Sequence, residues 1–259
     1  MMMAITRDVS PALERCELTH LPRTTIDVDR ARRQHAAYEQ CLMEAVCPVE
    51  RLPADATMPD SVFVEDIAVV FDELALITRP GAASRRAETP AVADALARYR
   101  TLRYIESPGC VDGGDVLLVR EQVFVGQSTR TNAAGIEQMR HILDPYGYTI
   151  DEVEMDLTAC LHLKSAVTAV SDDVLLMNRA WIDADRFARF AIVDVDPAEP
   201  LAANALPLGG LVIFPAAFPR TERRLTAHGF RVRTIDVSEF AKAEGGVTCC
   251  SLVFDATVP

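Results

Sequence analysis

"CVDGGDVLLVREQVFVGQ", residues 110–127, contains the pattern that organises this chain. Two apolar, strand-like runs, 115–120 and 122–127, follow a polar turn at Asp112. Branched and aromatic residues favour strands, whereas Asp-Gly-Gly favours a turn. A helix-like stretch comes next at 132–146, and Thr131 or Asn132 is a suitable N-cap for it. The pattern predicts an α/β unit with a polar cluster at the end of its strands.

The same alternation of strand-like and helix-like stretches recurs along all 259 residues. Apolar runs that are too short for helices predict further strands at 61–71, 74–79, 163–170, 173–178, 210–215 and 247–254. Helical spacing of apolar residues predicts helices at 27–46, 89–99, 183–190 and 221–228.

Polar or reactive residues end the strand-like runs at a nearly constant interval. These positions are Asp66, Asp112, His162, Asn204 and Cys249, and they are 46, 50, 42 and 45 residues apart. Such a period predicts five similar units in a closed, pseudo-symmetric ring. In that arrangement the five positions should converge on one cavity.

The composition of the chain argues against some binding partners and some cellular locations. The net charge is −12 and 49% of the residues are hydrophobic, which is typical of an acidic globular protein and argues against nucleic acid or anionic membranes as partners. No apolar run is long enough to span a membrane, and the first residues do not resemble a signal peptide, so we expect a cytoplasmic protein. Seven cysteines without a C-x-x-C pair argue against a structural zinc site.

Three acidic residues surround the apolar run "SVFVEDIAVVF". Asp60 precedes the run, while Glu65 and Asp66 lie within it. Adjacent residues on a strand point to opposite faces, so both acids can face one pocket only if the chain bends there. Paired carboxylates would bind a planar guanidinium cation well. The alternative is a surface turn.

Arginines in two loops could bind a carboxylate. Arg85 lies just before the helix expected at 89–99, and Arg130 lies just before the next one. Ligand contacts concentrate in such loops, and two arginines closing on one carboxylate would orient an amino-acid substrate. The alternative for each arginine is a solvated surface.

His162 is the best placed of the five histidines for acid–base chemistry, because it interrupts an apolar strand-like run. The alternative is a buried structural histidine. Asp112 could orient a histidine or a substrate nitrogen, or it could simply shape the Asp-Gly-Gly turn.

The stretch "EGGVTCCSLVF", 244–254, places two cysteines in an apolar run. Strand alternation would send Cys249 and Cys250 to opposite faces, so one is expected in the core and the other can be a nucleophile. A disulfide between neighbours would close a strained ring. Gly245 and Gly246 would let the backbone approach a ligand closely.

Six motifs, in this order, resemble those of the dimethylarginine dimethylaminohydrolases, which belong to the guanidine-modifying, arginine-deiminase-like superfamily. The motifs are "PDSVFVED", "ITRPGAASRRAE", "DGGDV", "RTNAAG", "LHLKS" and "GGVTCCS". The resemblance extends from about Leu18 to the end of the chain. It implies a five-bladed pseudo-symmetric α/β propeller (a pentein) of ββαβ-type units, with one catalytic domain over residues 1–259.

The resemblance also implies roles for individual residues. Cys249 resembles the nucleophile, His162 the general acid and base, and Asp112 the third catalytic carboxylate. Residues that resemble substrate contacts are Leu18, Asp60, Glu65, Asp66, Arg85, Arg130 and Ala243. Ala243 and Glu244 stand where family members often carry an apolar residue and Asp.

The implied reaction converts Nω-methylated L-arginines to L-citrulline and an alkylamine through a covalent S-alkylthiouronium on cysteine. It requires a small guanidinium amino acid as substrate and neither a metal nor a cofactor. The resemblance is compatible with either a monomer or a homodimer. An arginine deiminase or another guanidine hydrolase of the same fold is the nearest alternative, although arginine deiminases have longer chains. A binding propeller without catalysis is more remote, and strand alternation and ring strain argue against a thiol redox sensor that uses Cys249 and Cys250.

Overall fold

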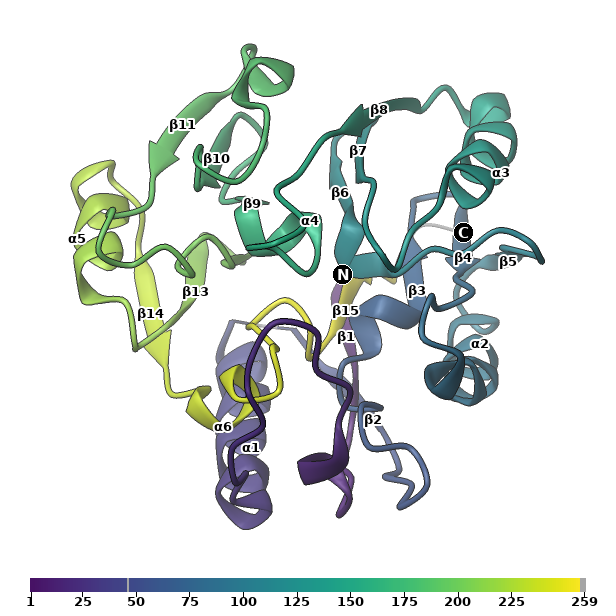
Figure 1. The fold of residues 1–259 in the computed structure, drawn as a ribbon, viewed down its shortest axis with the longest axis horizontal. Helices are drawn as coiled ribbons and strands as arrows, with labels where there is room; N and C mark the ends of the chain where they lie inside the picture. Colours follow the sequence, from purple (N-terminus) through teal and green to yellow (C-terminus); the bar gives the residue numbers. More distant parts are fainter. Residues whose placement is uncertain (46, 257–259) are drawn as a thin grey trace.

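The computed structural model describes residues 1–45 and 47–256, and these residues form five small sheets of three strands each. The sheets stand around a common centre like the blades of a propeller, with α1, α2, α3 and α5 at the periphery (Figure 1). The predicted five-bladed α/β propeller is therefore confirmed. Among the described residues no helix is both long and apolar enough to cross a membrane.

The elements are short, and their bounds are as follows. The strands are β1 (Met2–Arg7), β2 (Val49–Leu52), β3 (Ala68–Val70), β4 (Leu74–Ile77), β5 (Thr101–Tyr104), β6 (Val116–Val119), β7 (Gln122–Gly126), β8 (Thr149–Val153), β9 (Val167–Ala169), β10 (Val174–Met177), β11 (Ala191–Asp194), β12 (Leu206–Leu208), β13 (Leu211–Pro215), β14 (Val232–Ile235) and β15 (Leu252–Asp255). The α-helices are α1 (Val28–Glu44), α2 (Thr89–Leu96), α3 (Ala133–Leu143), α4 (Leu163–Ala166), α5 (Pro219–Ala227) and α6 (Ser238–Ala241). The 3-10 helices are η1 (Leu13–Arg15), η2 (Val64–Ile67), η3 (Ala83–Glu88), η4 (Gly113–Asp115), η5 (Asp144–Tyr146) and η6 (Ala184–Phe187).

One order of connections is repeated in each unit, and the third unit shows it clearly. β6 and β7 pair antiparallel, with Val116 opposite Val125. β7 then pairs parallel with β8, with Gln122 opposite Thr149. A parallel partner cannot be reached by a tight turn, so the chain crosses over through α3. The units that begin with β3, β9 and β12 repeat this order.

The first unit is built from both ends of the described chain. β1 pairs parallel with β2, and α1 connects them. The antiparallel partner of β1 is β15, with Met2 opposite Asp255 and Ile5 opposite Leu252. The last strand thus supplies the position that β3, β6, β9 and β12 occupy in the other units, and this pairing closes the ring.

β7 shows why the middle strands are apolar at nearly every residue. Val123 and Val125 face α3 and pack with Met139. Phe124 points to the opposite face and stacks on Phe187 of the fourth unit, with ring centroids 4.4 Å apart. Both faces are therefore buried, which removes the polar alternation of a half-exposed strand. Each such side chain contributes about 1.5–3 kcal/mol through burial, so the clusters between units stabilise the ring.

Four of the five predicted helices form close to their expected bounds. α1 begins after Asp27, whose side chain accepts a hydrogen bond from the Arg30 N–H, and Val46 of its predicted range lies outside the described residues. α3 begins after Asn132, which caps the Gly135 N–H, so one of the two suggested N-caps is confirmed. The predicted helix 183–190 is wrong in type and length, because only the 3-10 turn η6 forms there.

Three predicted strands are wrong over their first half. The run 61–71 contains the 3-10 helix η2 before β3, and 163–170 contains α4 before β9. In 247–254 a turn precedes β15. The predictions also omitted β1, β2, β5, β8, β11, β12 and β14. Several of these omitted strands are largely exposed, as in β5, so they lack the apolar runs that marked the others.

The three segments wrongly predicted as strand share one position in the architecture. Each lies immediately before the first strand of a unit, where the chain reaches the centre of the ring (Figure 1). The first strands of the units contact one another around that centre: β15 contacts β3, β6 contacts β9, and β9 contacts β12. We call these the inner strands. Each of the five polar positions with the 42–50 residue spacing precedes one inner strand. The predicted convergence on one cavity is confirmed for His162, Asn204 and Cys249, which line it, whereas Asp66 and Asp112 lie against His162 and do not line the cavity.

Candidate active site

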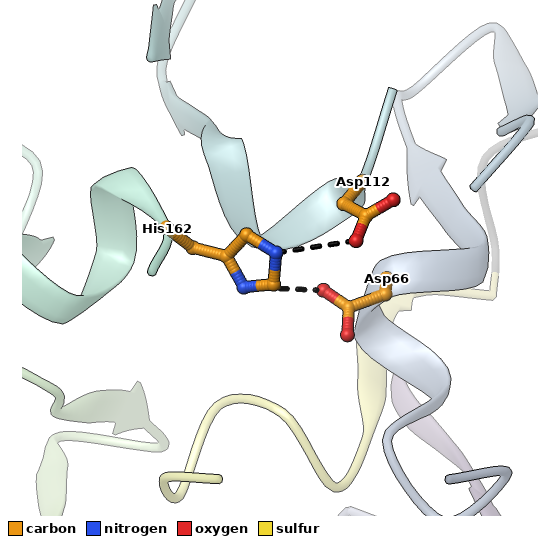
Figure 2. A group of neighbouring side chains, drawn as sticks. All are labelled: Asp66, Asp112 and His162. Carbon is orange, nitrogen blue, oxygen red and sulfur yellow. Dashed lines mark hydrogen bonds and ion pairs between the residues drawn. The ribbon is translucent and has the colours of Figure 1, made fainter. Parts of the chain in front are cut away.

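His162 is the extended residue directly before α4, and its ring lies between two carboxylates (Figure 2). Its Nε2 is 3.2 Å from Asp112 Oδ2, and its Nδ1 is 3.7 Å from Asp66 Oδ1. Burial opposes a charge on the imidazole, but the negative charges of Asp66, Asp115 and Asp112 outweigh it and raise the pKa of His162 to about 9. The imidazole is therefore protonated at neutral pH and can donate a proton.

Asp112 is completely buried, and its hydrogen bonds fix its orientation. Its Oδ1 accepts the Gly81 N–H at 2.9 Å, which leaves Oδ2 for His162. The Gly-Gly pair after Asp112 is needed for close packing as well as for the turn. A Cβ at Gly114 would lie 2.6 Å from His162 Nδ1 and 2.8 Å from Asp66 Oδ1. Only glycine allows this backbone to pass beside the histidine.

Asp66 lies in η2, whose helical turn replaces the strand predicted there. Its Oδ1 accepts the Gly114 N–H at 3.1 Å, and its Oδ2 accepts a bond from Arg85. Burial favours the neutral acid, but the positive charges of His162 and Arg85 prevail and lower the pKa of Asp66. Asp66 is therefore an anion that faces the imidazolium.

Arg85 occupies a buried position, and its donors are engaged within the protein. The guanidinium binds the carboxylates of Asp66 and Glu88 and the backbone carbonyls of Asp60 and Phe63. A buried charge needs such partners, and removal of one leaves the others unpaired. The structure thus gives Arg85 the role of holding Asp66 in place. It does not line the central cavity with Cys249 and His162, and contact with a substrate carboxylate stays a prediction.

Glu65 differs from its neighbour Asp66, because its carboxylate lines the central cavity. Oε1 accepts a hydrogen bond from Lys164 Nζ at 2.6 Å, and Oε2 accepts one from the Thr248 hydroxyl at 2.6 Å. The sequence interpretation did not include Lys164 or Thr248. Their signal was present, since they lie two residues after His162 and one before Cys249.

Cys249 lies in the turn before β15, and its side chain lines the same cavity as His162 and Glu65. Its Sγ accepts the Gly246 N–H at 3.3 Å. Burial and the nearby carboxylates of Glu65 and Asp66 raise the pKa of Cys249 to about 12, against the lowering effect of that N–H and of Lys164. Without a bound cation the group is a thiol at neutral pH.

Cys250 is the next residue of the turn, and its side chain is buried in the core. The prediction that one cysteine of the pair faces the cavity and the other packs in the core is confirmed. The reason given for it is wrong, because both residues lie in a turn and not on an alternating strand. All seven cysteines, including this pair, are free thiols in the structure.

The cavity has a volume of about 180 Å³ and lies where the units meet. One part of its lining is polar and consists of Glu65, His162, Lys164, Asn204 and Cys249. These residues come from the second, fourth and fifth units and from the turn before β15. Asp66 and Asp112 support His162 from behind. The remaining lining contains the apolar residues Leu21, Leu161, Leu201, Pro215, Phe218 and Val237 and also polar residues, among them Ser165, Asp236 and Ser238.

A loop from the N-terminal segment covers one side of the cavity, and Glu244 holds it there. The Glu244 carboxylate accepts the backbone N–H groups of Thr19, His20 and Leu21 at 2.6–2.9 Å. Glu244 itself has a φ of 60°, an unusual conformation for a residue other than glycine. His20, Leu21 and Glu244 all line the cavity.

The remaining predicted substrate contacts gather around this loop. Asp60 accepts the Glu17 N–H, and Arg130 donates to the Thr19 hydroxyl at 3.0 Å. Leu18 and Ala243 belong to the same hydrophobic cluster. The structure therefore brings Leu18, Asp60, Arg130 and Ala243 to one side of the site, although they do not line the cavity.

Within the described residues, one group could offer several ligand atoms to a metal ion. Asp66, Asp112 and His162 have such atoms within 4.8 Å of one another. The oxygens are already engaged, by Arg85 and Gly114 at Asp66 and by Gly81 and His162 at Asp112. The charges of these carboxylates are already paired with the imidazolium and Arg85, so they do not need an added cation. Asp66, Asp112 and His162 therefore suit proton transfer better than metal binding.

Comparison with known proteins places this fold and site. The arginine deiminase family model matches residues 87–207. The N(G),N(G)-dimethylarginine dimethylaminohydrolase of Streptomyces coelicolor is 41% identical over 252 residues, which cover 96% of this chain and 95% of that protein. The enzyme of the same name from Pseudomonas aeruginosa is 37% identical over 230 residues, which cover 88% and 90%. A solved structure of the Pseudomonas aeruginosa protein, a C249S mutant complexed with citrulline, superposes with a TM-score of 0.92 at 35% identity, over 97% of this chain and 98% of that one.

The propeller and its central cysteine, histidine and carboxylates define the arginine-deiminase-like class of proteins. Within that class, identity above 35% over nearly the whole length decides the family. The chain belongs to the dimethylarginine dimethylaminohydrolase family.

Proposed function

We propose that the protein hydrolyses Nω-methylated L-arginines, such as asymmetric dimethylarginine and monomethylarginine, to L-citrulline and an alkylamine. One observation carries the proposal: a thiol, an imidazolium and a carboxylate for a cation line one cavity, as Cys249, His162 and Glu65. The family and the citrulline-bound relative agree with this chemistry.

The substrate cation binds where the carboxylate of Glu65 lines the cavity. Glu65 faces the cavity, and Asp66 lies behind it as an anion. A guanidinium group presents planar donors that match carboxylate oxygens. Binding fixes the central carbon of the guanidinium near Cys249, so the later attack becomes effectively intramolecular.

Binding of the cation also prepares the nucleophile. The carboxylates of Glu65 and Asp66 are among the causes that raise the pKa of Cys249. A guanidinium placed between them and the sulfur offsets that repulsion, so the thiol can release its proton to solvent and become a thiolate. Cys249 then attacks the guanidinium carbon and forms a tetrahedral adduct through a new C–S bond.

His162 handles the protons of both half-reactions. Its pKa of about 9 makes it an imidazolium in the resting protein, so it can protonate the departing alkylamine as the C–N bond breaks. The product of this step is a covalent S-alkylthiouronium on Cys249. The neutral imidazole then takes a proton from water, which attacks the same carbon, and citrulline leaves as the C–S bond breaks. Asp112 holds the ring throughout.

The amino-acid end of the substrate is proposed to lie toward the loop that contains Leu18. Asp60, Arg130 and Ala243 gather there, and Arg130 bonds only the Thr19 hydroxyl through its side chain among the described residues. A substrate carboxylate could replace that hydroxyl as the partner of Arg130, since a charged pair is stronger than a bond to a neutral hydroxyl.

The proposal treats the chain as one catalytic domain, and closure of the ring by β1 and β15 supports this. Its partner is a small guanidinium amino acid. A cytoplasmic location, the absence of nucleic-acid or membrane partners, and the oligomeric state stay predictions from the sequence. The pairing of chains in solution can be measured by light scattering.

Paired product release tests the function. Purified protein is incubated separately with asymmetric dimethylarginine, monomethylarginine and arginine, and citrulline, alkylamine and ammonia are measured. Citrulline with stoichiometric dimethylamine from the first substrate is expected. Faster release of ammonia from arginine would instead identify an arginine deiminase, and absence of citrulline from all three would contradict the proposal.

Variants assign the nucleophile in the same assay. Cys249→Ser should abolish turnover while the protein stays folded, because an alcohol is far less acidic than a thiol. Cys250→Ala is the matched control, since its side chain packs in the core and should leave turnover in place. Citrulline formation by Cys249→Ser at the wild-type rate would reject this role for Cys249.

A further inference from the structure

Asp115 is a buried carboxylate that takes no part in the proposed reaction, yet three segments of the site meet on it. Its side chain is 0% exposed. Oδ1 accepts the backbone N–H of Leu163 at 3.1 Å. Oδ2 accepts the hydroxyl groups of Ser128 and Thr131, each at 2.6 Å. In the sequence this residue is the last acid of the "DGGDV" motif.

Each of these bonds leads to a residue of the proposed active site. Leu163 follows His162 directly, so its N–H fixes the backbone that carries the imidazole. The Thr131 hydroxyl oxygen accepts the Asp112 N–H at 3.1 Å. The second hydroxyl, that of Ser128, leads to the loop of Arg130.

The Ser128 oxygen accepts two backbone N–H groups, from Arg130 at 2.9 Å and from Thr131 at 3.1 Å. A hydroxyl has one donor and two acceptor positions. Ser128 has used both acceptor positions, so it can only donate to Asp115. Thr131 accepts one N–H from Asp112 and directs its own proton to Asp115.

The Asp115 carboxylate therefore accepts three hydrogen bonds, and each of its three partners is a donor. An ionised carboxylate is the side chain that satisfies them all, because both of its oxygens only accept. An amide of the same shape would turn its NH₂ group toward either the two hydroxyls or the Leu163 N–H. In each orientation donors face one another inside the protein, which is costly.

We propose that Asp115 is a positioning residue of the reaction: its carboxylate joins the segments of His162, Asp112 and Arg130 and fixes their mutual placement. The inference rests on the proposed function, and it adds a residue that touches neither the substrate nor the reacting atoms. Asp115 links the acid–base pair to the arginine proposed for the amino-acid end of the substrate.

Charges around Asp115 are consistent with this role. Burial raises the pKa of Asp115 to about 6, while His162 and the hydroxyls of Ser128 and Thr131 act in the opposite direction. The carboxylate is thus ionised at neutral pH. It adds to the negative field of Asp66 and Asp112 that keeps His162 protonated.

Asp115→Asn is the first variant to test. It keeps the volume but introduces a donor, so it should shift the His162 and Arg130 segments. A displacement of about 1 Å can cost about 10²-fold in rate, and we expect a loss of this order in kcat together with a rise in KM. Asp172→Asn removes the same charge in the exposed turn before β10 and serves as the control.

A second pair of variants keeps the proposal testable if Asp115→Asn does not fold. Thr131→Ser retains the hydroxyl, whereas Thr131→Val keeps the shape and removes it. Rates near wild type for the serine variant, with a loss of at least tenfold in kcat for the valine variant, are expected. Equal rates for Thr131→Ser and Thr131→Val would overturn the proposal.

The pKa of His162, measured by NMR of labelled imidazole, separates positioning from simple destabilisation. In folded Asp115→Asn it should fall, because one of the three carboxylates that hold the proton has gone. An unchanged His162 titration with activity and Tm falling together would leave Asp115 only a structural role and overturn the proposal. The titration does not need turnover, so failure of the proposed hydrolysis in wild-type protein is a separate, recognisable outcome.

Discussion

At the scale of single residues, the same negative field acts in opposite ways on the proposed acid, His162, and the proposed nucleophile, Cys249. Carboxylates raise the pKa of His162 and thereby charge it. They also raise the pKa of Cys249 and thereby keep it neutral. The resting site therefore holds a charged acid beside an inactive thiol. In the proposed mechanism a cation bound at Glu65 offsets the repulsion of the thiolate by the carboxylates, so the thiolate forms when substrate is bound.

Glu65→Gln should make the thiol more reactive and the enzyme less active. Loss of the carboxylate removes a cause of the raised pKa of Cys249 and leaves Lys164 unpaired nearby, so the thiolate fraction increases about tenfold for each pKa unit. Alkylation of Cys249 by iodoacetamide at pH 8 should be faster than in wild type. Citrulline formation should fall because the guanidinium loses a ligand.

Peptide mass spectrometry assigns the alkylation in this experiment to Cys249 or to another cysteine. Cys250→Ala again provides the matched control. Slower alkylation of Cys249 in Glu65→Gln would show that Glu65 does not suppress the thiolate.

His162 should stabilise the fold most at low pH. Its folded pKa of about 9 lies above the ordinary value of about 6.5, so the stabilisation is fully present below pH 6.5 and is lost as pH rises through 9. The difference in unfolding free energy between wild type and His162→Asn should therefore shrink by about 1–3 kcal/mol between pH 6.5 and 9.5.

Urea unfolding at the two pH values measures this difference. The same comparison with His141→Asn, on the exposed side of α3, controls for general effects of pH. A difference that stays constant between the two pH values would contradict the raised pKa of His162.

At the scale of elements, short helical turns replace strands at the centre of the ring. η2, η4 and α4 each turn a side chain inward immediately before an inner strand begins. A regular strand would send neighbouring side chains to opposite faces. The turns thus place Glu65 at the cavity and Asp66 against His162, although the two residues are adjacent.

Gly114→Ala in η4 tests how tightly these turns pack. The added Cβ would lie under 3 Å from both His162 Nδ1 and Asp66 Oδ1, so the pair must separate. We expect kcat to fall about 10²-fold or more. Gly147→Ala is the control: its φ of 82° makes alanine cost about 1–2 kcal/mol, but nothing lies within 4 Å of the new atom. Comparable losses of kcat in both variants would argue against the packing explanation.

The loop at 17–21 should loosen when Glu244 is changed to Gln. The amide would place a donor against backbone N–H groups, at about 1–3 kcal/mol for an unsatisfied group. We expect a higher KM and faster tryptic cleavage after Arg15 or Arg23, with a smaller effect on kcat. Glu121→Gln, in the exposed turn before β7, is the control. Wild-type protease resistance of Glu244→Gln would show that the loop does not depend on this carboxylate.

At the scale of the whole molecule, the site exists only because the ring is closed. Its groups come from the second, third, fourth and fifth units and from the turn before β15 in the first. β15 is held by β1, which begins at the opposite end of the described chain. Cys249, the proposed nucleophile, is therefore positioned by a pairing between residues about 250 apart in sequence.

A circular permutant should retain the fold if the ring is closed in this way. A short flexible linker would join the ends beside β1 and β15, with new termini at Gly147, an exposed turn without close neighbours. We expect kcat within about tenfold of wild type, since no contact of the site changes. A permutant opened at Gly114 should be inactive. Inactive, unfolded protein from the Gly147 permutant alone would contradict closure through β1 and β15.

The repeated unit, the central positions and the family follow from the sequence without the structure. Buried middle strands read as continuous apolar runs because both of their faces are covered, and the polar positions before the inner strands recur with the period of the units. These signals and the order of the motifs predict Cys249, His162, Asp112 and Glu65 as site residues. The outer strands were missed because a half-exposed strand such as β5 depends on its parallel neighbour more than on its own residues.

Which charged side chains pair with one another depends on the tertiary structure. Arg85 resembles a substrate contact in the sequence, and that contact stays a prediction, while the structure shows its buried guanidinium bound to Asp66 and Glu88. Lys164, Asp115 and Glu244 lie close to predicted positions in the sequence, but the role of each depends on a partner that is distant in sequence. Burial and the sum of neighbouring charges set the pKa of a group, and both arise only when the five units meet.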